Sequence, residues 1–193
     1  MEQVQPADVD VLAKSLGELP QAVARPVLVV VSGLPGTGKS YFCRCLSERL
    51  AAVILESDAL RRTLFPQPSH SQQESARLFK AIRQLAERLL RQGRCIILDA
   101  TNLSERYREY LYSIAGRLEV KLVLVSVRAP SPLVRERLAQ RASSGEGNSD
   151  AGWEVYQKMK SSVEKIRRKH YVADTSRDIT PVIEKIMREV GRI

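Results

Sequence analysis

A glycine-rich segment of eight residues constrains this 193-residue chain more than any other feature. Residues 33–40 read Gly-Leu-Pro-Gly-Thr-Gly-Lys-Ser and fit the phosphate-binding loop pattern G-x-x-x-x-G-K-[ST] at every specified position. The apolar run Val27–Val31 precedes the segment, and an amphipathic stretch, Tyr41–Leu50, follows it. The sequence therefore predicts a strand, a loop that holds the phosphates of a nucleotide, and a helix.

The residue types in this loop explain how it would hold phosphate. Glycines let the backbone wrap around an anion, so that successive N–H groups form a nest, and the following helix adds its positive end. Lys39 supplies a charge for the outer phosphates, and the Ser40 hydroxyl can join a Mg²⁺ shell. We expect the whole loop to bind nucleotide: Gly33, Leu34, Pro35, Gly36, Thr37, Gly38, Lys39 and Ser40.

Composition argues against several other classes of protein. Three cysteines without paired spacing argue against a disulfide framework, and two histidines argue against a zinc site. The N-terminus has no signal-peptide pattern and no apolar run is long enough to span a membrane, so we expect a cytoplasmic protein that does not contact membranes. The net charge of +9 suits phosphorylated ligands or a nucleic-acid surface, although many of the charges would lie on solvated helix faces.

Short apolar runs alternate with longer amphipathic stretches along the chain. This alternation predicts an α/β fold with a five-stranded parallel sheet and helices on both faces. The predicted strands are Val27–Val31, Ala52–Leu55, Cys95–Leu98, Lys121–Val127 and Tyr171–Ala173. The predicted helices are Lys39–Leu50, Ala59–Leu64, Gln72–Gln92, Ser104–Arg117, Pro132–Arg141, Gly152–Lys169 and Pro181–Val190.

We expect one nucleotide-binding domain over residues 27–193, preceded by a polar extension. The extension, residues 1–26, has one predicted helix near Val9–Leu19. A small lid is expected near residues 137–152, because the small-residue stretch Ala142–Ser149 would make a flexible hinge between two helices.

In open α/β sheets ligands bind at the carboxyl ends of the strands, and unusual polar residues follow the predicted strands here. Asp58 could accept a proton from an attacking hydroxyl, while Arg61, on the same helix face, could hold a negative group. Taken alone, Ser57 or Asp58 is more typical of a helix N-cap, and Asp58 could do both, since a cap position also fixes a carboxylate in place. Asp99 closes the third strand at the position where a carboxylate binds Mg²⁺, although a turn aspartate is the alternative.

Arg137 and Arg141 lie four residues apart on the helix that leads into the predicted lid. Arginines on a lid stabilise the charge of a moving phosphoryl group when the lid closes. A solvated helix face is the alternative for such a pair.

These motifs together resemble the P-loop kinases of the polynucleotide kinase and zeta-toxin-like group. The resemblance covers residues from about 27 to 190, and the family pattern implies ATP and Mg²⁺ as cofactors. It implies that Lys39 and Ser40 hold phosphate and metal, that Asp58 is the general base, and that Asp99 lies beside the acceptor and metal. Arg61 would contact the acceptor, Arg137 and Arg141 would be lid arginines, and Thr175, Ser176 and Arg177 would lie near the adenine. The resemblance rests on residues 33–40, Glu56–Arg61, Leu98–Leu103, Arg137 with Arg141, Ser149–Glu154 and Asp174–Arg177.

The resemblance implies transfer of the ATP γ-phosphate to a hydroxyl group. A 5′-hydroxyl polynucleotide end is the first expectation for the acceptor, with a sugar, antibiotic, nucleotide-sugar or adenylylsulfate as the alternative. An ATPase switch would need a coupling domain for which we see no sequence, and a non-enzymatic nucleic-acid module conflicts with the complete phosphate loop. The sequence names neither the acceptor nor the oligomeric state, because loops such as residues 66–70 would build the acceptor pocket.

Overall fold

A five-stranded parallel sheet forms the centre of the molecule in the computed structural model, which describes residues 6–144 and 151–191. The strand order is β2-β3-β1-β4-β5, so the strand before the phosphate loop is central. The strands are β1 (Val27–Ser32), β2 (Ala52–Glu56), β3 (Cys95–Asp99), β4 (Lys121–Arg128) and β5 (Tyr171–Asp174). Each begins where the sequence predicted and runs one residue further, because a polar residue still pairs in the ladder after the apolar run has ended.

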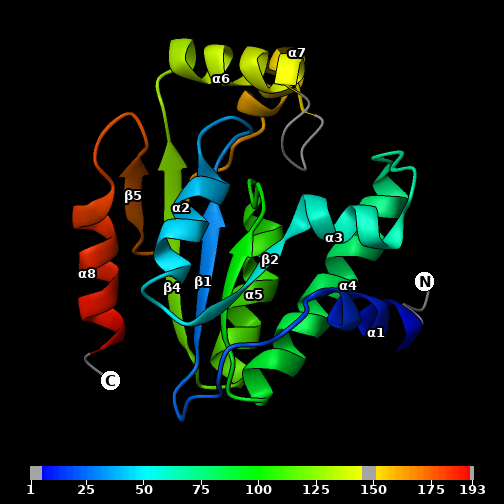
Figure 1. Ribbon diagram of the computed structural model, residues 1–193, viewed down its shortest axis with the longest axis vertical. Coiled ribbons are helices and arrows are strands. Elements are labelled where there is room, and N and C mark those ends of the chain that lie inside the picture. The colour runs from blue at the N-terminus through cyan, green and yellow to red at the C-terminus, as the bar shows by residue number, and fades with distance from the viewer. Residues whose placement is uncertain (1–5, 145–150, 192–193) are drawn as a thin grey trace.

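Helices cover both faces of the sheet, as predicted (Figure 1). The described helices are α1 (Pro6–Ser15), α2 (Lys39–Ser47), α3 (Ser57–Leu64), α4 (Gln72–Arg91), α5 (Glu105–Arg117), α6 (Ser131–Ser144), α7 (Trp153–Lys160) and α8 (Thr180–Val190). Leu28 and Val30 of β1 pack in the core beneath α4 and α5, whereas Val27, Val29 and Val31 pack in the core beneath α2 and α8. The helices α6 and α7 lie across the carboxyl ends of the strands. Across the described residues, none of these helices is long and apolar enough to cross a membrane.

The helix predicted over Gly152–Lys169 is less than half as long in the structure, where it spans Trp153–Lys160. It ends at Lys160, and residues 161–170, here called the strap, run on as irregular chain to β5. The backbone N–H of Glu164 donates to the carbonyl of Leu103 at 3.0 Å, and the Arg108 guanidinium donates to the carbonyl of Glu164 at 2.9 Å. Contacts with distant residues thus replace the helical hydrogen bonds that the local sequence would support.

The N-terminal helix starts and ends earlier than its predicted range of Val9–Leu19. It spans Pro6–Ser15, and Gly17 follows it with a φ of 65°, the left-handed conformation that commonly ends a helix. Leu12 is fully buried in the same core as α4, and Asp8 accepts two hydrogen bonds of 2.7 Å from Arg77 on α4. Residues of the extension therefore pack as part of the core beneath α4.

Candidate active site

The phosphate-binding loop connects β1 to α2 and needs its glycines for steric reasons. The backbone N–H of Gly33 donates to the Thr101 carbonyl at 3.1 Å, and a Cβ atom at Gly33 would lie only 2.6 Å from the Val127 carbonyl. Gly36 and Gly38 have φ angles of 77° and 87°, which other residues rarely adopt. The loop therefore passes close against β4 and turns in a way that only glycine allows.

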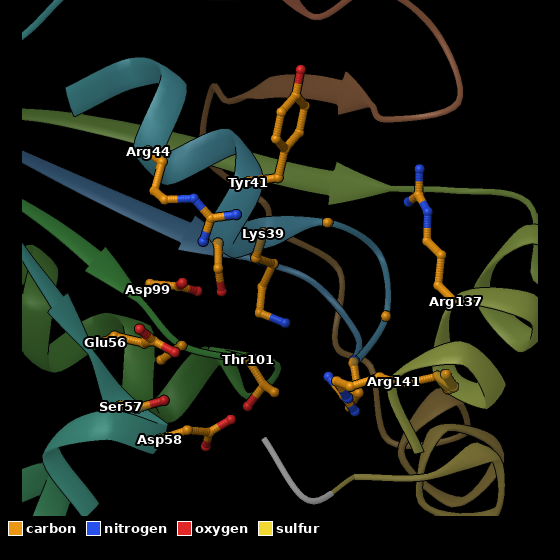
Figure 2. A pocket seen from close by; sticks show the side chains of 16 residues that line it. Lys39, Tyr41, Arg44, Glu56, Ser57, Asp58, Asp99, Thr101, Arg137 and Arg141 are labelled. Carbon is orange, nitrogen blue, oxygen red and sulfur yellow. The ribbon is translucent and has the colours of Figure 1, made fainter. Parts of the chain in front are cut away.

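A cavity of about 320 Å³ lies at the carboxyl ends of the strands beside this loop (Figure 2). Five of the six predicted catalytic residues line it: Lys39, Asp58, Asp99, Arg137 and Arg141. The remaining lining residues are Pro35, Gly36, Gly38, Ser40, Tyr41, Arg44, Glu56, Ser57, Ala100, Thr101 and Leu138. Folding thus brings together residues that are up to about a hundred positions apart in the sequence.

Lys39, Asp58 and Asp99 point toward the middle of the cavity from three different elements (Figure 2). Burial lowers the pKa of Lys39, while the charges of Asp99 and Asp58 act in the opposite direction. Burial raises the pKa of Asp99, and this rise is opposed by Lys39 and by a hydrogen bond with Ser40. The Lys39 ammonium and the Asp99 carboxylate are therefore close enough for each to influence the pKa of the other.

The Asp99 side chain leaves one oxygen free for a cation. Asp99 is 3% exposed, and its Oδ2 atom has no hydrogen-bond partner among the described residues. The Ser40 hydroxyl lies beside this carboxylate. Mg²⁺ is usually held by one or two protein oxygens together with substrate phosphates, so this pair fits a Mg²⁺ that also binds a nucleotide. The described residues contain no cluster of three His, Cys, Asp or Glu that would hold a metal by itself.

The two predicted lid arginines take different directions. Arg137 points away from the cavity centre (Figure 2) and donates to the side chain and the carbonyl of Thr175, at 2.8 and 2.9 Å. Thr175 in turn donates to the carbonyl of Thr37 at 2.7 Å, which ties α6 to the phosphate loop. Arg141 lies close enough to lower the pKa of Lys39 and donates a hydrogen bond to the Ala151 carbonyl. Residues 145–150 of the predicted lid lie outside the described residues.

The remaining predicted nucleotide contacts lie outside the cavity. Gly33, Leu34 and Thr37 belong to the loop but line a second cavity. Thr175 reaches the loop through its hydrogen bond to Thr37, whereas Ser176 is exposed and bonds to Asp174 at 2.7 Å. Arg177 is also exposed, with its Nε atom 3.9 Å from Asp174. The role of these last two residues near an adenine stays a prediction.

The structure does not bring Arg61 to the cavity where the sequence placed it. Arg61 is 7% exposed, and its guanidinium forms an ion pair with Glu74 and donates to the Ser75 hydroxyl at 3.2 Å. Glu74 also accepts a 2.7 Å hydrogen bond from the Ser69 backbone. Ser71 and Glu74 have the spacing of a helix-capping box, which predicts a helix start but not a buried partner for an arginine on another helix.

Seven residues that line the cavity were not among the predicted site residues: Tyr41, Arg44, Glu56, Ser57, Ala100, Thr101 and Leu138. Arg44 lies one helical turn after Ser40, and Glu56 is paired in register with Asp99 across β2 and β3. The helical spacing could have indicated Arg44, because residues four apart share a face. Tyr41 and Thr101 carry no such signal, because their position depends on how α2 and the turn after β3 are packed.

Comparisons with known proteins identify the family and the relatives of this fold. A family model described as an AAA domain matches residues 28–166 of the chain. The L-seryl-tRNA(Sec) kinase of Methanococcus maripaludis is 29% identical over 120 residues, which cover 60% of this chain and 46% of that protein. The chain thus spans about half the length of that relative.

Two solved kinase structures share the fold. The adenylylsulfate kinase CysC of Mycobacterium tuberculosis, in complex with AMPPNP and APS, superposes with a TM-score of 0.65 and 18% identity, covering 86% of this chain and 98% of that one. A gluconokinase of Sinorhizobium meliloti gives a TM-score of 0.62 and 18% identity, covering 86% and 93%. Because the family model spans well over half of the sequence, the chain belongs to this AAA-domain family of P-loop kinases.

Proposed function

We propose that this protein transfers the γ-phosphate of ATP, with Mg²⁺, to the hydroxyl group of a small acceptor. The observation that carries the proposal is that Asp58 lines the same cavity as Lys39 and the Ser40–Asp99 pair. A carboxylate in that position can accept the proton of an attacking hydroxyl. Mg²⁺, when bound, would neutralise charge on the phosphates, with Ser40 and Asp99 as its protein ligands.

The charge of the acceptor side supports a small neutral or cationic acceptor. Glu56 and Asp58 line the cavity at the end of β2 and the start of α3, and Arg44 of α2 lines it as well. The other cations of the lining are Lys39 in the phosphate loop and Arg137 and Arg141 on α6, whose charge the ATP phosphates would use. Arg61 is already paired with Glu74. Like charges at short range are costly, so the Asp58 carboxylate, with Glu56 nearby, disfavours a polyanionic strand as the acceptor.

The polynucleotide end that the sequence favoured is therefore the alternative acceptor, with the net charge of +9 as its remaining support.

A transfer assay separates these acceptors. The protein is incubated with Mg²⁺, γ-labelled ATP and one acceptor at a time: sugars, sugar acids, aminoglycosides, adenylylsulfate, or 5′-hydroxyl DNA and RNA oligonucleotides. We expect label on a small compound and none on the oligonucleotides. Efficient labelling of a nucleic-acid end would reverse our choice of acceptor.

Asp58→Asn tests the assignment of the base. Removing a general base lowers turnover by roughly 10²–10⁴-fold, and ATP affinity should change little because Asp58 acts in the chemical step. Asp10→Asn, a change at an exposed ion pair with Arg88, is the matched control and should leave both quantities unchanged. Rapid acceptor-independent ATP hydrolysis that Asp58→Asn does not alter would favour an ATPase switch instead.

We also propose a cytoplasmic location, where ATP is available. Cys43, Cys45 and Cys95 are all free thiols in the structure. Free cysteines are the usual state in a reducing compartment, which supports this proposal. Fractionation of cells that produce the tagged protein would test it.

A further inference from the structure

Arg108 on α5 is charged and yet among the most deeply buried side chains, at 1% exposed. It does not line the candidate active site. Its Nε atom donates to Glu105 at 2.7 Å, and its two terminal nitrogens donate to three backbone carbonyls. Burying a guanidinium is costly unless its N–H groups are bonded in this way.

The first carbonyl belongs to Asn102, in the turn between β3 and α5. Arg108 donates to it at 2.6 Å, and the Ser32 hydroxyl lies 3.4 Å from the same oxygen. Asn102 has a left-handed φ of 45°, and its side-chain amide donates to the Val31 carbonyl at 2.8 Å. The preceding residue, Thr101, accepts the hydrogen bond from Gly33. This turn therefore contacts the three consecutive residues by which the chain enters the phosphate loop.

The other two carbonyls belong to Glu164 and Lys165 in the strap, at 2.9 and 3.3 Å from Arg108. The strap continues from α7, whose Tyr156 packs with Val134 and Leu138 of α6. Since α6 carries Arg137 and Arg141, one guanidinium joins the phosphate loop to the segment that supports the lid arginines.

We propose that Arg108 is a positioning residue for nucleotide binding, which sets the phosphate-binding loop through Asn102 and anchors the strap behind it. Without Arg108 the turn at residues 101–102 loses a hydrogen bond that fixes its position. The backbone N–H groups of the phosphate loop are then no longer held in one orientation toward the phosphates. A misplacement of about 1 Å in a binding constellation can cost roughly 100-fold in function. The proposal rests on the ATP-binding part of the proposed function and is independent of the acceptor.

The test measures ATP affinity by calorimetry and unfolding stability by urea titration. Arg108→Met should weaken ATP binding at least tenfold, and Asn102→Ala should do the same. The effect of the double variant should be smaller than the product of the two single effects, because the residues act as one unit. Leu111→Ala, one turn along α5 at a residue that is 2% exposed, is the stability-matched control and should keep ATP affinity within twofold.

Arg108→Lys covers the case in which Arg108→Met fails to fold. Lysine keeps the charge but cannot reach all the carbonyls at once, so it should still weaken ATP binding several-fold. Wild-type ATP affinity in the folded Arg108 and Asn102 variants would overturn the proposal. An equal loss of affinity in Leu111→Ala would also overturn it, since stability alone would then explain the effect. If wild type binds ATP but phosphorylates no acceptor, the proposed kinase function fails while this test remains valid.

Discussion

Neutralising the buried pair of Arg61 and Glu74 should destabilise the fold rather than impair acceptor binding. The partners are 8% and 7% exposed in their side chains. Burial alone would raise the pKa of Glu74, but hydrogen bonds from the Ser69 backbone and from Arg61 outweigh it and lower the pKa from 4.5 to about 2. This shift corresponds to about 3 kcal/mol, similar to the 3–5 kcal/mol typically lost when a buried pair is broken. We expect Glu74→Gln to lower the free energy of unfolding by about 3 kcal/mol at pH 7.

The destabilisation should depend on pH in a defined direction. The folded pKa of Glu74 is depressed, so its ionised form stabilises the protein above the unfolded pKa near 4.5, and this stabilisation disappears as pH falls toward about 2. The difference between wild type and Glu74→Gln should therefore shrink to about 1.4 kcal/mol at pH 3. Urea denaturation followed by circular dichroism at several pH values measures this difference.

A matched surface pair provides the control. Arg88 and Asp10 are 49% and 56% exposed, so Arg88→Gln should change stability by less than about 1 kcal/mol. Arg61→Gln should resemble Glu74→Gln in stability. If Arg61→Gln instead kept wild-type stability and raised only the KM for the acceptor, Arg61 would be a substrate contact and our structural reading would be wrong.

Three further predictions follow from the packing and from the site. Leu12→Ala should lower the free energy of unfolding by about 2–4 kcal/mol, since Leu12 is fully buried. The control Val11→Ala, at a 43% exposed position, should have little effect, and urea titration measures both variants. Equal stabilities of the two variants would mean that the extension is dispensable. Asp99→Asn should raise the Mg²⁺ concentration needed for half-maximal transfer at least tenfold, with an unchanged requirement counting against the metal assignment. Gly36→Ala should weaken ATP binding at least tenfold in calorimetry, because its Cβ would lie 2.9 Å from Leu138 in a backbone conformation that disfavours alanine, and wild-type affinity would contradict this.

The strands and the helices on both faces could be read from the sequence because their signals are local. Apolar runs such as Val27–Val31 and Cys95–Leu98 report burial on both faces, and each run ended one residue before the true strand end. The phosphate loop is specified by its own glycines and lysine. Asp58 and Asp99 were also predictable, since they follow strands of a parallel sheet and must therefore meet at one edge.

Other features could not be predicted because they depend on partners far away in the chain. Arg61 has a sequence context suited to an acceptor contact, yet Glu74, on the next helix, is its partner. The helical pattern continues after Lys160 in the sequence but not in the structure. There the Arg108 guanidinium donates hydrogen bonds to the carbonyls of residues 164 and 165. The residues next to Arg61 do not indicate Glu74 as its partner, and the residues next to 164–165 do not indicate Arg108.

The sequence by itself determined the phosphate loop, the order of strands and helices, and the edge of the sheet at which the site lies, because each depends on residues close together in the chain. The tertiary structure alone decided which side chains line the cavity, that Arg61 pairs with Glu74 outside it, and that a buried arginine joins the loop to the strap. Those properties depend on how α2, α3, α5 and α6 pack around the strand ends. A buried polar side chain must form hydrogen bonds with the groups that this packing places next to it.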